Sequence, residues 1–160
     1  MELLQYLYIA VILLLLLKIA YIDFKTQYIY IRDLYTLAIV VLLYKIYIDD
    51  LMFSILAGAA AYIFGYTIYK TSYLYYKEEA FGLGDVYLLG ILGAYWSWPT
   101  IIHFLYFSFL LAGIIGLIVL IFTKKGKYRI AFVPILNISV FLYYLCGLPD
   151  IYSITSKILL

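Results

Sequence analysis

The sequence has little of what most metal-binding and thiol-based sites are built from. Its 160 residues include one cysteine, Cys146, and one histidine, His103. A disulfide within the chain and a zinc cluster of cysteine and histidine ligands are therefore excluded for this chain alone. Charged residues are also scarce, at 12% of the chain. We expect no metal ion and no cofactor, and nothing in the sequence indicates a nucleic-acid partner.

Apolar residues are abundant instead. They make up 68% of the chain and form runs too long for a soluble domain of this size to bury. The sequence predicts an all-α, polytopic integral membrane protein in which residues 1–160 form one membrane-embedded domain. The first apolar run lacks the basic start and small-residue cleavage site of a secretory signal, so we expect it to be a retained anchor.

The apolar runs predict six membrane-spanning helices. A spanning helix needs about 20 residues, and shorter helices are tolerated where neighbours bury them. The predicted helices cover residues 3–22, 34–48, 51–69, 86–96, 100–122 and 130–145, and a longer polar loop separates the third from the fourth.

Basic residues collect in alternate loops between these helices. Under the positive-inside rule that side is cytoplasmic, both termini face outward and the chain lies in the plasma or inner membrane. The eight basic residues on that side are Lys25, Arg32, Lys70, Lys77, Lys124, Lys125, Lys127 and Arg129, whereas Glu2, Asp49, Asp50 and Asp150 fall on the other side.

Four polar side chains near the helices have ordinary structural interpretations. Asp33 precedes the predicted second helix, where a carboxylate commonly acts as the N-cap. Lys18 is expected to extend to the cytoplasmic interface. Asn137 and His103 are expected to be packing or internally bonded polar groups.

Asp23 lies at the C-terminal end of the first predicted helix. The helix dipole disfavours a carboxylate there, and no capping role is expected. Asp85 directly precedes the fourth predicted helix and follows Gly82 and Gly84, which allow close backbone approach. Gly90 and Gly93 continue one face of that helix and let a neighbouring helix come near.

Asp23 and Asp85 are predicted to lie at the same membrane depth and on the same side. Two carboxylates held close together cannot both ionise and share a proton. The ionised member can then activate a water molecule, while the protonated member hydrogen-bonds a peptide carbonyl. The pair therefore predicts hydrolysis without a nucleophilic serine or cysteine.

Three blocks of sequence resemble the type IV prepilin peptidases, membrane aspartyl proteases of the Gly-x-Gly-Asp class. The blocks are "DFKTQYIYIRDL", "FGLGDVYLLGILGA" and "IAFVPIL". The resemblance implies that Asp23 and Asp85 are catalytic and that Gly82 and Gly84 shape the site. It also implies a prepilin or pseudopilin substrate with a short basic leader, a glycine at the cleavage point and an apolar helix.

The sequence departs from the family pattern at a few positions. Tyr30 and Ala131 stand where proline is usual, and Tyr87 where lysine commonly follows Asp-Val. The amino-terminal zinc-binding and methyltransferase block of many bacterial members is absent, so we expect a short, peptidase-only form.

Several questions stay open from the sequence. Glu78 and Glu79 either attract the basic leader or are ordinary solvated loop charges. One alternative function is an intramembrane protease of the presenilin or signal-peptide-peptidase kind, and another is a non-enzymatic transport or assembly component. Oligomeric state and the identity of the pilin-like substrate are not indicated.

Overall fold

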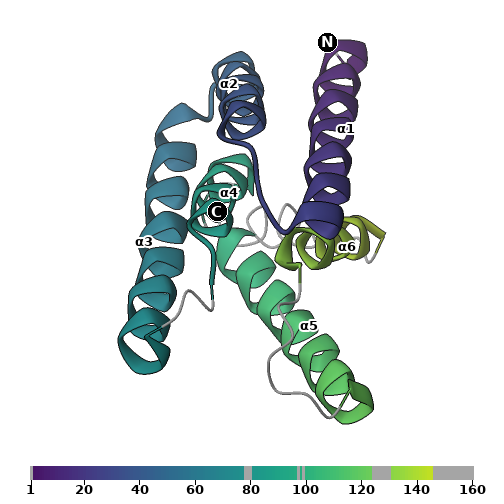
Figure 1. The fold of residues 1–160 in the computed structure, drawn as a ribbon. Coiled ribbons are helices and arrows are strands. Elements are labelled where there is room, and N and C mark those ends of the chain that lie inside the picture. The colour runs from purple at the N-terminus through teal and green to yellow at the C-terminus, as the bar shows by residue number, and fades with distance from the viewer. Residues whose placement is uncertain (1, 78–80, 97, 99, 124–130, 146–160) are drawn as a thin grey trace, which may run out of the picture.

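The computed structural model describes residues 2–77, 81–96, 98, 100–123 and 131–145, and these residues form six α-helices (Figure 1). This number agrees with the prediction. The helices are α1 (Glu2–Thr26), α2 (Ile31–Tyr47), α3 (Leu51–Tyr76), α4 (Leu83–Trp96), α5 (Thr100–Thr123) and α6 (Phe132–Leu145).

Three of the helices are long and apolar enough to cross a membrane. The candidate spans are Leu3–Thr26, Leu51–Tyr75 and Thr100–Val119, while α4 and α6 are shorter apolar helices. Together with the apolar composition, these helices identify an integral membrane protein.

α3 extends seven residues beyond its predicted end at Tyr69, so the expected polar loop between the third and fourth helices is much shorter. Hydroxyl groups in the extension bond back to the helix: Thr71 donates to the Thr67 carbonyl at 2.7 Å and Ser72 to the Tyr69 carbonyl at 2.9 Å. Because these polar side chains are satisfied internally, the helix continues. It ends where Lys77 adopts a left-handed conformation with φ 52°.

The prediction of Asp33 as an N-cap is wrong. α2 begins three residues earlier than predicted, Tyr30 occupies the N-cap without a side-chain hydrogen bond, and Asp33 is the third residue of the helix. Its buried carboxylate forms an ion pair with Lys18 of α1, with 2.7 Å between Nζ and Oδ1. Lys18 thus has an ionic partner, and an ionic group among apolar helices is less costly when paired.

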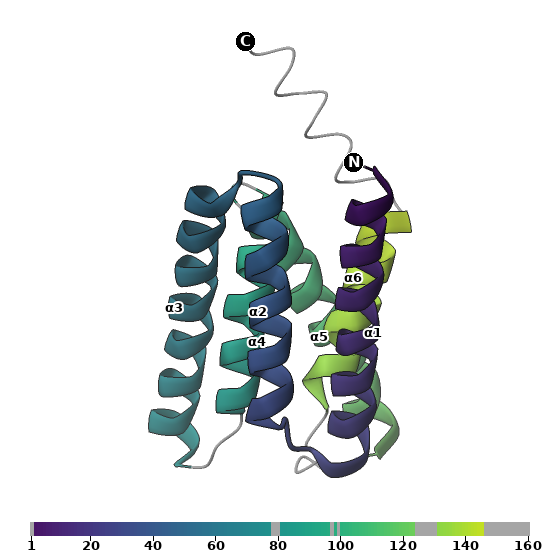
Figure 2. The ribbon, with the colours of Figure 1, turned by 90° about the horizontal axis from the view of Figure 1, so that it is seen from above.

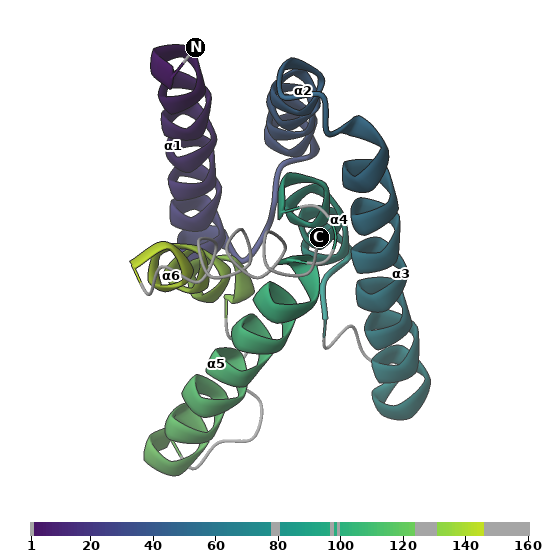
Figure 3. The ribbon, with the colours of Figure 1, turned by 180° about the vertical axis from the view of Figure 1, so that it is seen from behind.

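α4 occupies the centre of the helix arrangement and packs against α2, α3 and α5 (Figure 3). Its side chains Leu88, Leu89 and Leu92 are almost completely buried. Because other helices pack around α4, this 14-residue helix is apolar apart from Asp85 in its first turn.

The α3–α4 contact is the most extensive in the molecule, and glycines make it possible. A Cβ atom added at Gly93 would lie 2.6 Å from the Ala61 Cβ and 2.8 Å from the Ala57 carbonyl oxygen. One added at Gly90 would lie 3.2 Å from the Tyr62 Cβ. The prediction that Gly90 and Gly93 admit a neighbouring helix is confirmed.

The first four helices alternate in direction (Figure 2). The end of α1, the start of α2, the end of α3 and the start of α4 lie at one end of the molecule, which is the lower end in Figure 2. The start of α1 and the turn between α2 and α3 lie at the opposite end. This alternation brings the last turn of α1 and the first turn of α4 to the same level.

Candidate active site

Asp23 and Asp85 come from two different helices at the same end of the molecule. Asp23 lies in the last turn of α1 and Asp85 in the first turn of α4. The two carboxylates are close enough to interact electrostatically. The structure thus brings together the two side chains that the sequence singled out.

The Asp23 carboxylate is held by the start of α6. Its side chain is buried, and Oδ2 accepts a hydrogen bond of 3.1 Å from the backbone N–H of Val133, the second residue of α6. The first N–H groups of a helix have no partner within the helix and carry the positive end of its dipole. The expectation that Asp23 has no capping role is therefore wrong, because Asp23 caps a helix more than 100 residues away.

A second polar contact fixes α6 against α1. The Asn137 side-chain amide donates to the Leu16 carbonyl oxygen at 2.7 Å. This confirms the expectation of an internal bond for Asn137. Because Asn137 lies one turn after Val133, the two hydrogen bonds set both the position and the register of α6 beside Asp23.

Asp85 is the third residue of α4, so the prediction that it precedes the helix is wrong. The helix begins at Leu83, and the Asp85 backbone N–H donates to the Gly82 carbonyl at 3.1 Å. The Asp85 carboxylate in turn interacts with the Gly82 backbone, as an acidic third residue does in a capping box.

One carboxylate oxygen of Asp85 has no hydrogen-bond partner. Oδ1 is buried, and none of the described residues donates to it. A buried acceptor without a donor is unfavourable and is characteristic of a place that a ligand or water completes. The pair can therefore act as base and acid on a water molecule bound at this oxygen.

The two glycines before Asp85 leave room in different directions. A Cβ atom added at Gly84 would lie 3.0 Å from the Ile29 Cβ, so Gly84 lets α4 pack against the connection between α1 and α2. One added at Gly82 would lie 3.1 Å from Oδ2 of Asp85. Gly82 thus keeps the space beside the carboxylate open.

The sequence interpretation missed two phenylalanines that adjoin the backbone supports of the two aspartates. Phe132 directly precedes Val133, Phe81 directly precedes Gly82, and their rings meet edge to face at a centroid distance of 5.2 Å. The block "IAFVPIL" marked the start of α6 but gave no sign of this contact, because Phe81 and Phe132 are 51 residues apart.

The remaining expectations about the site concern charges and metals. Glu78 and Glu79 lie outside the described residues. Within the part of the chain that the structure describes, no group of three or more histidine, cysteine, aspartate or glutamate side chains could hold a metal ion.

Comparison with known proteins gives a family match. The model of the type IV leader peptidase family matches residues 10–117, which include Asp23 and Asp85. A curated prepilin leader peptidase/N-methyltransferase from Haemophilus influenzae is 36% identical over 91 residues. The aligned region covers 57% of this chain and 38% of that relative, so the chain matches less than half of the relative's length. No solved structure matches the chain.

Proposed function

Since the chain belongs to the type IV leader peptidase family, we propose that it is a membrane aspartyl endopeptidase that removes the short basic leader from prepilin-like proteins. The observation that carries the proposal is that Asp23 and Asp85 lie at the same end of the molecule, close enough to interact electrostatically. Both lie within the region that the family model matches.

Hydrolysis by this pair requires one proton shared between the two carboxylates. The ionised carboxylate takes a proton from water, the water oxygen attacks the scissile carbonyl carbon, and the protonated carboxyl group hydrogen-bonds the carbonyl oxygen. When the C–N bond breaks, the leaving nitrogen takes the proton that the base removed from water, and the carboxylate pair returns to its starting state. The unpartnered Oδ1 of Asp85 is a suitable position for the water.

The same proposal includes six membrane crossings with the catalytic end in the cytoplasm and both termini outside. Two ion pairs made by residues of α2 support this arrangement. Asp33 is paired with Lys18 at one end, and the buried Lys45 is paired with Asp50 at the other, with 2.9 Å between Nζ and Oδ2. Pairing lowers the cost of placing such groups in a bilayer.

The distribution of charge also supports this orientation. Lys25, Arg32 and Lys77 lie at the end of the molecule that holds the aspartates, and Asp49 and Asp50 lie at the opposite end. Under the positive-inside rule the aspartates are at the cytoplasmic edge of the membrane. Cleavage at that edge suits a substrate whose basic leader stays in the cytoplasm, and Glu78 and Glu79 are candidates for contacting that leader.

The test is cleavage of a helix-bearing substrate by the purified full-length chain in lipid nanodiscs. Asp23→Asn and Asp85→Asn are each expected to lower the cleavage rate by at least about 100-fold, since each removes one acid or base. Asp49→Asn is the matched control, because Asp49 is exposed at the opposite end. Retained cleavage in a folded Asp23→Asn or Asp85→Asn variant would show that the dyad assignment is wrong.

A further inference from the structure

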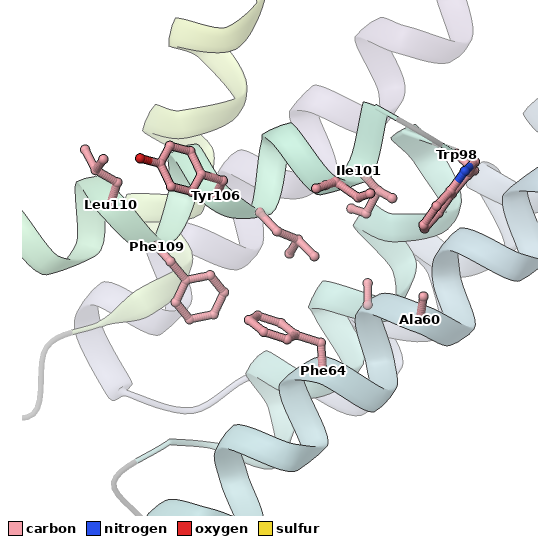
Figure 4. Close-up of a pocket in the computed structure, with 10 residues that line it drawn as sticks. Ala60, Phe64, Trp98, Ile101, Tyr106, Phe109 and Leu110 are labelled. Atoms are coloured by element: carbon pink, nitrogen blue, oxygen red, sulfur yellow. The ribbon is translucent and has the colours of Figure 1, made fainter.

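An apolar hollow lies between α3 and α5 (Figure 4). It encloses about 630 Å³, and its lining includes Ala60 and Phe64 from α3, Ile101, Leu105 and Phe109 from α5, and Trp98. The two helices make few contacts with each other and diverge toward the bottom of Figure 1. The hollow therefore opens sideways, in the direction from which a membrane-embedded segment would enter.

A row of four aromatic rings joins this hollow to the supports of both aspartates. Phe64 and Phe109, which line the hollow, meet edge to face at 5.4 Å between centroids. Phe109 then contacts Phe132 at 5.6 Å, and Phe132 contacts Phe81 at 5.2 Å. Phe132 precedes the residue that binds Asp23, and Phe81 precedes the glycine beside Asp85, so side-chain contacts link the hollow to the site.

Asp85 lies on the side of α4 that faces the hollow. Residues at spacings of four, seven and eleven share one helix face, so Asp85 shares its face with Leu89, Leu92 and Trp96. The Trp96 ring stacks on Phe104 of α5 at a centroid distance of 5.4 Å. The face that carries Asp85 is therefore the one toward α5 and the hollow.

A second hollow, of about 450 Å³, lies between α2, α3 and α4 and serves as a comparison. The nearest lining residue to Asp85 in the sequence is Tyr87, whose ring contacts Tyr62 of α3 at 5.9 Å between centroids. Among the described residues, the ring contacts of Tyr62 and Tyr87 join α3 to α4.

We propose that the hollow between α3 and α5 binds the apolar helix of the substrate, with the Phe64–Phe109 end next to the cleavage point. This inference rests on the proposed function. A chain cleaved between two aspartates at the membrane edge continues directly into the bilayer, and this hollow is the apolar space that the row of rings links to the site. Ala60 is small and exposed, so it allows a helix to approach closely, as small residues do in other membrane helix pairs.

The first experiment fills the hollow and compares two substrates. One is a synthetic protein with a lysine-bearing leader and an apolar helix, and the other is a short peptide that ends before the helix. Ala60→Trp is expected to lower kcat/KM for the helix-bearing substrate by at least about tenfold, mainly through KM, since it occupies the space of the helix. Cleavage of the short peptide is expected to stay within about twofold of the wild-type rate.

Ala59→Trp is the matched control. Ala59 is the neighbouring residue, it is also exposed, and it lines the second hollow instead. If Ala59→Trp and Ala60→Trp affect the helix-bearing substrate equally, the hollow is filled by lipid and the inference is wrong. It is also wrong if Ala60→Trp lowers cleavage of both substrates to the same degree.

A binding experiment separates this inference from the proposed function. A photo-crosslinking residue replaces Ile102 of the first hollow or Ile55 of the second, both exposed positions, in Asp85→Asn protein in nanodiscs. Crosslinks from position 102 to the substrate helix, with at least about tenfold fewer from position 55, are expected. Equal yields overturn the inference even if cleavage is observed. If the wild type cleaves neither substrate, the proposed function fails while these yields still decide the occupant of the hollow.

Discussion

Asp23 and Val133 are 110 residues apart in the chain and are joined by a hydrogen bond of 3.1 Å between the Asp23 carboxylate and the Val133 backbone N–H. The carboxylate lies at the unfavourable end of its own helix and at the favourable end of α6. The position that is electrostatically poor in the context of α1 alone is thus stabilised by a second helix. This dual placement gives Asp23 a structural role that can be separated from its proposed chemical one.

The first prediction separates those roles by comparing two substitutions of Asp23. Asp23→Asn keeps a side-chain oxygen that can accept from Val133, so the free energy of unfolding is expected to stay within about 1 kcal/mol of the wild-type value while cleavage is lost. Asp23→Ala leaves the Val133 N–H unpaired and is expected to cost about 1–3 kcal/mol more. Thermal unfolding in detergent and the cleavage assay measure the two effects. Equal loss of stability in both variants would argue against the hydrogen bond.

The second prediction concerns the ion pair between Lys18 and Asp33. The Lys18 side chain is half exposed and that of Asp33 is 5% exposed, so removing the cation leaves a buried carboxylate without its partner. Lys18→Met is expected to lower the free energy of unfolding by about 2 kcal/mol, and Lys18→Met with Asp33→Leu is expected to recover most of that loss. A double-mutant cycle by thermal unfolding measures this coupling. Additive losses would contradict it.

The number of helices and several of their limits could be predicted because the breaks carry local signals. The acidic pair Asp49-Asp50 precedes α3, and Pro99 comes three residues after Trp96. The start of α3 and the end of α4 were therefore predicted correctly. The end of α3 could not be predicted from composition, since Thr71 and Ser72 are polar but bond within the helix.

The sequence pointed to two side chains of the candidate site and gave no sign of the groups that support them. Asp23 and Asp85 stood out because each is a carboxylate at the edge of an apolar run. The partners of Asp23 and Asp33 could not be identified, because Val133 and Lys18 reach them only through helix packing. Contacts between helices depend on which faces meet, and a single sequence does not contain that information.

The third prediction tests the glycine contact between α3 and α4. Gly93→Ala places a methyl group 2.6 Å from the Ala61 Cβ and 2.8 Å from a backbone oxygen, neither of which can rotate away. The free energy of unfolding is expected to fall by about 1–3 kcal/mol. Gly113→Ala in α5 is the control, since an added Cβ there has no atom within 4 Å, and it is expected to be neutral or to stabilise by up to about 1 kcal/mol. Equal thermal midpoints for the two variants would contradict the packing.

The fourth prediction uses Gly84 to test whether the spacing between α4 and the connection from α1 to α2 sets the geometry of the aspartates. In Gly84→Ala the new Cβ lies 3.0 Å from the Ile29 Cβ, so the first turn of α4 must shift by a few tenths of an ångström and carry Asp85 with it. Since catalysis is sensitive to misplacements well below 1 Å, kcat is expected to fall about tenfold while KM changes little. The free energy of unfolding is expected to fall by only about 1 kcal/mol, because the shift relieves most of the overlap. Gly116→Ala, where an added Cβ has no atom within 4 Å, is expected to leave kcat unchanged and to leave the free energy of unfolding unchanged or raise it by up to about 1 kcal/mol. A fall in activity that merely follows the loss of folded protein would mean that Gly84 supports the fold and not the geometry of the pair.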